Sequence, residues 1–487
     1  MSLARRPRPR VLYVHHRGTG GTPETTADLM GALVDGYEPY LLTSDTSALE
    51  LWRTEAEGTE LVERWVLPER ISPGQFTQPA YRAAVSDILI RHAIDLVHIR
   101  VLLAHTFDLP SVARALDIPV VLSFHDYFLV CPTFHLLDEA NRFCGGVCTP
   151  GDGACRIPSD WVRGVPHLKH SWVKEWQRAV AGMLADCDAF VTTSPTARAI
   201  YLRTYPHLAT APFQLIEHGR DLEFEPVAAM PDLRGPVRVV IPGAFDVHKG
   251  APFIERLLEL DTAGRLEFHF LGKVPEEFRH LGVIHGPYER GQFARKLHEI
   301  RPAFVGILSI WAETYSHTLS EAWAAGVPVL VNDLGAPMER VEAHGGGWVL
   351  DHRDPAGAYK RIIGICDDPP EYRRVRAEVG LRGVRSLRAM ADDYDALYGS
   401  VFWSRRAIKR PAEPQPSVLR AAMFVVGSRT GRYAPTAHVR MLQRLGHPLV
   451  RQEIVAEPTD VQAFIDGATV EPDVALVLRT AIPPDLM

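Results

Sequence analysis

The stretch FVGILSIWAETYSHTLSEAWAAGVPVLV, residues 304–331, decides the fold. It opens as a buried strand that ends near Ile310, and it closes as a second apolar strand. A helix is predicted over residues 318–325, because Gly326 and Pro328 are typical residues just beyond a helix end. A strand, a helix and a further strand in this order predict a parallel sheet covered by helices.

Short apolar runs separated by helix-like segments continue on both sides of this stretch. Pro226, Pro231 and Pro236 interrupt them and predict a linker, while Thr22 and Ser194, each followed by proline, predict helix N-caps. The fold class is therefore α/β, with two Rossmann-like, doubly wound domains facing a cleft and ligands at the carboxyl ends of the strands. The predicted strands are residues 11–15, 39–42, 96–99, 120–124, 189–192 and 214–217 in the first domain, and residues 237–241, 266–271, 283–285, 304–309, 327–332 and 347–350 in the second.

The rest of the chain divides at Pro411, Pro414 and Pro416, after which the alternation of strands and helices begins again. A returning amphipathic helix is predicted to bury Ala391, Tyr394, Leu397 and Tyr398 on one face. After it, strands near residues 421–426 and 474–478 and a helix near 437–445 form a partial α/β unit that we expect to be truncated, because it is a poor independent core. The predicted order is a basic tail at 1–9, an N-terminal domain at 10–222, a C-terminal domain at 237–389, the returning helix at 390–404, a linker at 405–417 and the partial unit at 418–487.

The composition is that of an ordinary globular protein, with 46% hydrophobic and 23% charged residues. A formal net charge of −6 argues against nucleic acid as a partner. The arginines near the start are expected to form a solvated, disordered arm rather than a lipid or polyanion contact. No apolar run reaches the roughly 18 residues of a membrane span, and no secretory signal precedes the first strand. We expect a cytoplasmic protein, and peripheral contact with a membrane stays open.

Two glutamates flank the start of the helix at residues 318–325: Glu313 lies in the loop before it and Glu321 one turn inside it. Backbone N–H groups and the dipole at a helix start favour a bound diphosphate. The loop carboxylate can accept hydrogen bonds from sugar hydroxyls, and the second carboxylate can accept them from ribose hydroxyls. The alternative is a capping box from Thr318 to Glu321, which needs no ligand.

Residues 311–328 resemble the E-x7-E segment of the family-4 retaining glycosyltransferases of the GT-B fold, of the kind that builds bacterial polysaccharides and cell-surface glycans. Other segments match that family in the same order across roughly residues 10–403. They are FHDY at 124–127 followed by Cys131-Pro132, IEHGRD at 216–221, GAFDVHKG at 243–250 and DLGAPME at 333–339. The resemblance implies transfer of a sugar from a nucleoside diphosphate donor to a glycan or lipid-linked acceptor.

The resemblance also implies roles for the matching residues. Lys249 would bind the donor diphosphate as a point charge, Glu313 the hydroxyls of the sugar, and Glu321 the ribose. His125 would lie beside the transferred sugar, which makes His125 and Glu313 the candidate catalytic residues. A solvated Lys249 and a structural His125 are the alternatives. The candidate donor-binding residues are Gly20, Gly21, Lys249, Ser316, His317, Thr318 and Glu321.

One departure from the family concerns the diphosphate. The family often carries an arginine early in the segment before Lys249, where this chain has Ala244 and Phe245. Arg17 is a candidate replacement. The family retains anomeric configuration, with the leaving phosphate accepting the acceptor's proton, so we assign no separate base, although Asp126 is a candidate. No Asp-x-Asp element is present where a metal-dependent transferase would need one, so catalysis is expected to require no cofactor.

Four cysteines, Cys131, Cys144, Cys148 and Cys155, lie in one loop of the N-terminal domain, residues 131–155. Four thiolates could close a tetrahedral structural zinc site in a loop that otherwise lacks a core. Because the spacing lacks paired C-x2-C elements, unpaired thiols and disulfides are the alternatives.

Two other functions stay open at this point. An epimerase-type enzyme on the same fold would convert a nucleotide sugar without any acceptor. A non-catalytic nucleotide-sugar-binding module would turn over no donor, and replacing Glu313 by alanine would cost it nothing.

Overall fold

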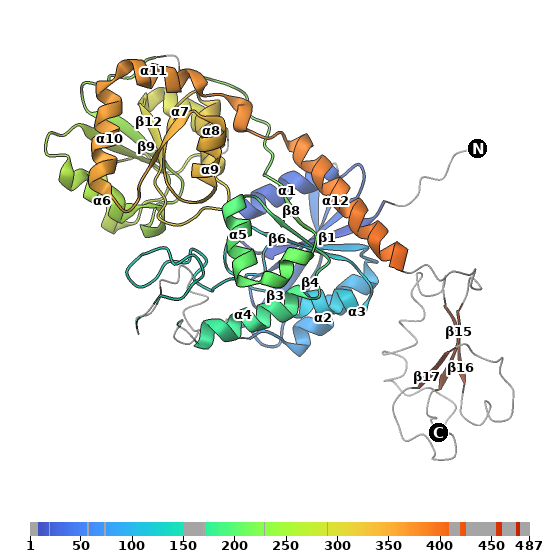
Figure 1. The fold of residues 1–487 in the computed structure, drawn as a ribbon. Coiled ribbons are helices and arrows are strands. Elements are labelled where there is room, and N and C mark those ends of the chain that lie inside the picture. The colour runs from blue at the N-terminus through green and yellow to red at the C-terminus, as the bar shows by residue number, and fades with distance from the viewer. Residues whose placement is uncertain are drawn as a thin grey trace, which may run out of the picture. The chain divides into compact units, whose positions relative to one another are not determined.

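The computed structural model describes residues 8–18, 20–55, 58–72, 75–149, 151, 155, 169, 171–227, 229–289, 291–408, 419–424, 454–459 and 474–477. The chain divides into two compact units, one of Met1–Leu89 and Ile94–Trp403 and the other of Ile90–Ala93 and Ser404–Met487. Figure 1 follows the chain through both. Most of the predicted basic tail and linker, and the helix predicted near residues 437–445, lie outside the described residues.

The first unit begins with a sheet in the order β4-β3-β2-β1-β5-β6-β7-β8. Its strands run parallel except β3, which is antiparallel to both β2 and β4. The central strands are mostly apolar and buried, as expected for strands covered by helices on both faces. The elements are β1 (Arg10–His16), α1 (Gly21–Leu33), β2 (Glu38–Ser44), β3 (Ala48–Glu55), β4 (Gly58–Val66), α2 (Pro79–Arg91), β5 (Leu96–Ile99), α3 (Asp108–Ala115), β6 (Val120–Phe124), α4 (Ser171–Leu184), β7 (Ala189–Thr192), α5 (Pro195–Thr204), η2 (Pro206–Thr210) and β8 (Phe213–Leu215).

The same unit continues with a second sheet, whose six strands are all parallel in the order β11-β10-β9-β12-β13-β14. In Figure 1, α6 and α10 lie on one side of this sheet and α8 and α9 on the other. The mixed α/β architecture with two Rossmann-like domains is therefore confirmed. The elements are β9 (Val237–Pro242), η3 (Val247–Lys249), α6 (Ala251–Leu260), β10 (Leu266–Leu271), η4 (Glu276–Leu281), β11 (Val283–Ile284), α7 (Phe293–Ile300), β12 (Phe304–Ile307), α8 (His317–Ala324), β13 (Val329–Asn332), α9 (Gly335–His344), β14 (Gly347–Leu350), α10 (Pro355–Asp367), α11 (Pro369–Glu378) and η5 (Leu381–Gly383).

The two predicted helix caps have different outcomes. Ser194 caps α5, because its side chain accepts a hydrogen bond from the Ala197 N–H at 3.2 Å. The prediction for Thr22 was wrong, since α1 already begins at Gly21 with Gly20 as its N-cap. Gly20 has φ 129°, a conformation that favours glycine, so the backbone rather than a threonine side chain starts this helix.

The last helix, α12 (Leu387–Ile408), returns to the first sheet. Its predicted buried face is confirmed, since Tyr394 and Tyr398 are fully buried. They pack in one apolar cluster with Val11 and Tyr13 of β1. Hydroxyl groups on the helix also reach buried polar side chains of the first domain: the Tyr394 hydroxyl accepts from Arg100 Nη1 at 2.9 Å. The first domain is thus completed by residues that follow the second.

The second unit contains β15 (Leu419–Phe424), β16 (Ile454–Thr459) and β17 (Val474–Val477), parallel in the order β16-β15-β17. Two of these strands lie where the sequence predicts them, and β16 was not predicted. Among the described residues of the whole chain, none of the helices is both long and apolar enough to cross a bilayer.

Candidate functional site

A cavity of about 620 Å³ is lined by residues that follow strands of both sheets in the first unit. From the first sheet come residues after β1 and β6, including His125 and Asp126. From the second come Lys249 and the loop between β12 and α8. These are the carboxyl ends of parallel strands, where ligands bind in open α/β sheets. The lining residues are His16, Gly21, Thr22, Leu103, His125, Asp126, Phe134, His135, His218, Lys249, Trp311, Glu313, Thr314, Tyr315, Ser316 and His317.

Lys249 and Glu313 form an ion pair on the wall of this cavity. The distance from Lys249 Nζ to Glu313 Oε1 is 2.6 Å, and the Ser309 hydroxyl donates to the same carboxylate. The Glu313 side chain is 8% exposed and that of Lys249 is 28% exposed. The backbone next to Lys249 packs closely against the loop after β12: Gly250 has φ 95°, and a Cβ atom there would lie 2.1 Å from the Leu308 carbonyl oxygen. This close packing, which only glycine allows, fixes the position of Lys249.

The loop before α8 is hydrogen-bonded to the backbone of the first domain. Thr314 Oγ1 donates to the His125 carbonyl at 2.6 Å, and the Tyr315 hydroxyl donates to the His218 carbonyl at 2.8 Å. Ser316, the N-cap residue of α8, has φ 153° and ψ 101°, which is a strained conformation for a residue with a side chain. This loop therefore holds a fixed, high-energy shape at the point where the helix amides meet the cavity.

The alternative of a capping box from Thr318 to Glu321 does not match the structure. Helix α8 begins at His317, with Ser316 as its N-cap and no capping hydrogen bond from its side chain. Glu321 instead accepts a hydrogen bond from Arg220 Nη1 at 2.6 Å. Its carboxylate is thus engaged by a residue 101 positions away, and the alternative that needs only local structure does not hold.

Three histidine rings stack along one wall of the cavity: His125 on His218 with centroids 5.0 Å apart, and His218 on His317 at 5.3 Å. Burial lowers the pKa of His125 and His218 well below the usual 6.5, and neighbouring cationic groups lower it further. Both rings are therefore neutral at pH 7. Among the described residues, neither ring nitrogen of His125 has a hydrogen-bond partner, so this ring can donate to or accept from a ligand hydroxyl.

Asp126, beside this stack, has a pKa raised to about 6 by burial, although the N–H of Phe128 donates to its carboxylate at 2.8 Å. Its carbonyl oxygen accepts from the Tyr201 hydroxyl at 2.7 Å. Asp126 lines the same cavity as His125. The carboxyl group can thus change its protonation state near neutral pH.

Two family models match the chain. The model described as Glycosyltransferase Family 4 matches residues 19–224, and the one described as Glycosyl transferases group 1 matches residues 296–379. The chain is a family-4-type glycosyltransferase of the GT-B fold. Comparison with curated protein sequences gives no match.

Solved structures similar to this glycosyltransferase share its fold at low sequence identity. Anabaena HepE, in complex with UDP and glucose, has 13% identity and a TM-score of 0.54 over 80% of this chain and 99% of its own. Sucrose-phosphate synthase from Thermosynechococcus elongatus has 17% identity and a TM-score of 0.57 over 82% and 100%. The α,α-trehalose-phosphate synthase (UDP-forming) from Burkholderia vietnamiensis has 12% identity and a TM-score of 0.51 over 82% and 99%.

The other predicted site residues of the glycosyltransferase lie around the cavity or beyond it. Gly20 and Thr318 do not line the cavity themselves, but each is the sequence neighbour of a lining residue, Gly21 and His317. Glu321 lines a second cavity of about 310 Å³ together with Arg220. Arg17 lines neither of these two cavities.

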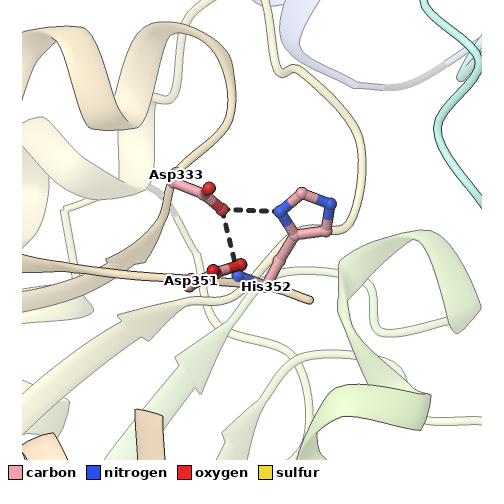
Figure 2. Close-up of side chains that lie close together, drawn as sticks. All are labelled: Asp333, Asp351 and His352. Carbon is pink, nitrogen blue, oxygen red and sulfur yellow. Dashed lines mark hydrogen bonds and ion pairs between the residues drawn. The ribbon is translucent and has the colours of Figure 1, made fainter. Parts of the chain in front are cut away.

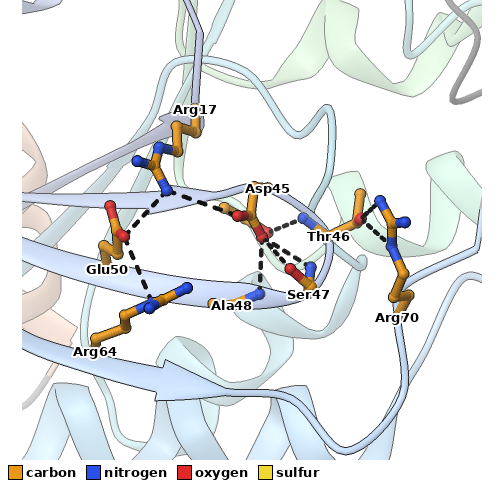
Figure 3. Close-up of polar contacts among 9 residues, drawn as sticks. Arg17, Asp45, Thr46, Ser47, Ala48, Glu50, Arg64 and Arg70 are labelled. Atoms are coloured by element: carbon orange, nitrogen blue, oxygen red, sulfur yellow. Dashed lines mark hydrogen bonds and ion pairs between the residues drawn. The ribbon is translucent and has the colours of Figure 1, made fainter.

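Arg17 binds acidic residues of the first sheet instead. Figure 3 shows it between Asp45 and Glu50, at 3.6 Å and 3.2 Å, with Arg64 also 3.6 Å from Glu50. Its charge is therefore already compensated, and these contacts do not support Arg17 as the replacement for the missing arginine.

The cysteine loop of the glycosyltransferase holds no disulfide within the described residues. Burial raises the pKa of Cys131 to about 12 and that of Cys155 to about 11, so both are neutral thiols at pH 7. Among the described residues, the group whose ligand atoms gather within 4.8 Å of one another is not the cysteines but Asp333, Asp351 and His352. Figure 2 shows that group. The hydrogen bond from His352 Nδ1 to Asp333 Oδ1, 2.5 Å long, accounts for its compactness, and zinc at the cysteines stays a prediction.

Sequence reasoning missed two arginines that shape the site. Arg220 binds Glu321, and Arg340 is 4% exposed and donates to the Ser316 carbonyl at 2.9 Å. The Arg340 guanidinium also lies 4.4 Å from the centroid of the Tyr315 ring. A charged residue within otherwise ordinary helical or linker sequence was the only available signal, and it did not reveal these partners.

Proposed function

We propose that the protein transfers a sugar, with retention of anomeric configuration, from a nucleoside diphosphate donor to a carbohydrate or lipid-linked acceptor. The observation that carries this proposal is the single cavity shared by Lys249, Glu313, His125 and the first residues of α8. A cation, helix-start amides and neutral hydrogen-bonding groups around one space suit a sugar joined to an anionic leaving group.

The similar solved structures support the choice of donor. HepE was solved in complex with UDP and also with UDP-glucose, and the trehalose-phosphate synthase is described as UDP-forming. A nucleoside diphosphate sugar is therefore the donor class that we propose for this chain.

The proposed reaction breaks the bond between the anomeric carbon and the diphosphate oxygen. The Lys249 ammonium and the amides of residues 316–318 stabilise the negative charge that develops on the leaving group. The acceptor oxygen forms its bond on the same face of the sugar, and its proton passes to the leaving phosphate oxygen. No side chain needs to act as the base in this scheme, and it uses no divalent cation.

The carboxylates and the histidine orient the donor. Glu313 accepts hydrogen bonds from hydroxyls of the transferred sugar, and Glu321 accepts them from the ribose. The neutral His125 ring bonds to one sugar hydroxyl. Gly20 and Gly21 leave room for the backbone to approach the phosphates.

A panel of nucleoside diphosphates and their sugars tests the proposal. A ligand present at 100 times its Kd should add about 2.7 kcal/mol of stability, which thermal unfolding detects. The stabilising donor is then incubated with glycan and lipid-linked acceptors, and NMR reports the anomeric configuration of the product. Conversion of the donor without an acceptor would instead indicate an epimerase, and stable binding without release of diphosphate would indicate a binding module.

A further inference from the structure

Three charged residues from separate segments meet beside the second cavity. Arg220, which follows β8, donates through Nη1 to Glu321 of α8 at 2.6 Å and through Nη2 to Glu24 of α1 at 3.1 Å. Glu24 belongs to the first domain and Glu321 to the second, so one guanidinium joins carboxylates of both domains. We call Arg220, Glu24 and Glu321 the arginine bridge.

The backbone around Arg220 is held firmly. Its N–H donates to the Arg385 carbonyl at 2.9 Å, just before α12. At the preceding Gly219, a Cβ atom would lie 2.3 Å from the Ser386 carbonyl oxygen, so only glycine allows this approach. The guanidinium is therefore presented from a fixed segment and not from a loose loop.

The arginine bridge is poorly explained as a device for stability alone. Arg220 is 6% exposed, and the Glu321 side chain is 11% exposed. Burying such a pair costs desolvation that the attraction often fails to offset. The buried Nε of Arg220 has no hydrogen-bond partner among the described residues, which adds to the cost. What the bridge does achieve is a single orientation of the Glu321 carboxylate.

We propose that Arg220 is a positioning residue for the donor nucleotide: it orients and neutralises Glu321 at the ribose and ties that contact to Glu24 of the first domain. This rests on the proposed function, in which Glu321 binds ribose hydroxyls. Both Arg220 and Glu321 line the cavity of about 310 Å³, which Phe293 and Ala294 also line. A carboxylate has about four acceptor positions, so bonding to arginine does not exhaust its capacity for hydroxyl donors.

Electrostatics explains why the donor needs this arginine. A nucleoside diphosphate is an anion, and an uncompensated, largely buried Glu321 beside it would repel it. The guanidinium removes that repulsion while its planar fork fixes the carboxylate. Lysine could supply the charge but not the rigid planar fork whose two nitrogens reach Glu321 and Glu24. The Glu24 side chain is 51% exposed, so its contact with Arg220 is the weaker one.

The test compares Arg220→Met, Arg220→Lys and Glu24→Gln with a control, Arg374→Met. Arg374 forms an equally short ion pair with Glu378, 2.6 Å long, on the surface of α11. Isothermal titration measures the Kd of the nucleoside diphosphate that best stabilises the wild-type protein, and the Kd of inorganic pyrophosphate. Thermal unfolding of every variant without ligand shows whether it is folded.

We expect Arg220→Met to weaken nucleoside diphosphate binding at least about 10-fold, Arg220→Lys to recover part of this, and Glu24→Gln to lose about 3-fold or less. Pyrophosphate binding should weaken less, by about 3-fold at most, because pyrophosphate senses the uncompensated charge of Glu321 but makes no ribose contact. A merely structural role would lower the affinity for both ligands by the same factor, and that result would also overturn the positioning role. If folded Arg220→Met binds the nucleoside diphosphate like the wild type, the positioning role is overturned and the proposed function stands. If no nucleoside diphosphate binds the wild-type protein, the proposed function itself fails.

Discussion

Replacing Glu313 by glutamine separates the two partners that this carboxylate could serve. In the structure Glu313 is the counterion of Lys249, at 2.6 Å, and it lines the cavity proposed for the sugar. If it is only a counterion, its removal frees the ammonium for phosphate and costs the donor nothing. If it binds sugar hydroxyls, the sugar-bearing donor alone loses a contact.

The two effects have opposite signs and can be estimated. Freeing a partly exposed lysine from its ion pair is worth up to about 1 kcal/mol to an incoming anion, or roughly 5-fold tighter nucleoside diphosphate binding. Losing a hydrogen bond to a charged group costs about 1.5–3 kcal/mol, or roughly 10- to 150-fold. The ratio of the Kd of the nucleotide sugar to that of the nucleoside diphosphate should therefore rise at least about 10-fold in Glu313→Gln.

Titration calorimetry with both ligands measures this ratio, and turnover of the donor should fall in parallel. Glu267→Gln is the matched control, because Glu267 on β10 also pairs with a cation, Arg238 at 3.3 Å, but its side chain is 39% exposed and does not line the cavity. An unchanged ratio with normal turnover would refute sugar binding by Glu313 and leave it as a counterion.

Three further outcomes are expected. Because burial lowers the pKa of His218 well below 6.5, the neutral ring contributes stability above pH 6.5, and this stability is lost on acidification. The thermal midpoint of the His218→Gln variant should therefore fall less between pH 7.5 and 5 than that of the wild type. An equal fall in both proteins would contradict this. Gly250→Ala should lose on the order of 1–3 kcal/mol or more in urea unfolding, because its Cβ atom would meet the Leu308 carbonyl, whereas Gly364→Ala, in open space within α10, should be neutral or slightly stabilising. Metal analysis of the purified protein should find zinc that is lost in Cys144→Ser if the cysteine loop holds a structural site; a metal-free wild type would exclude it.

The sequence predicts the elements whose signal is local. Residues 96–99 and 120–124 are short runs that are apolar except for His98 and Ser123, and the structure has strands with the same limits. Strands β3 and β4 were missed, because glutamates and arginines interrupt the apolar residues of both strands, and β4 is an exposed edge strand. Thr22 looked like a cap because it precedes a proline, but Gly20 starts the helix earlier through its backbone.

The candidate site follows the same division. Lys249 and Glu313 were identified from segment resemblance, and the structure brings them together across 64 positions of sequence. Arg220 lies in the matching segment at 216–221, but the resemblance did not give its role, because its partners lie 196 and 101 positions away and nothing local marks an arginine that will be buried. Arg17 was chosen for its nearness in sequence to the glycine loop, yet it forms ion pairs with Glu50 of β3 and with Asp45, just after β2.

The return of α12 to the first sheet bears on the order in which the chain can fold. The apolar face formed by Val11, Tyr13 and Leu96 is covered by Met390, Tyr394 and other side chains of α12. During synthesis, that face therefore stays exposed until the whole of the second domain and α12 have left the ribosome. An N-terminal fragment that ends at the linker between the two domains would keep every strand of the first sheet but would expose this apolar face to solvent. Anyone dividing this enzyme into halves for expression should accordingly graft residues 387–402 back onto the N-terminal piece.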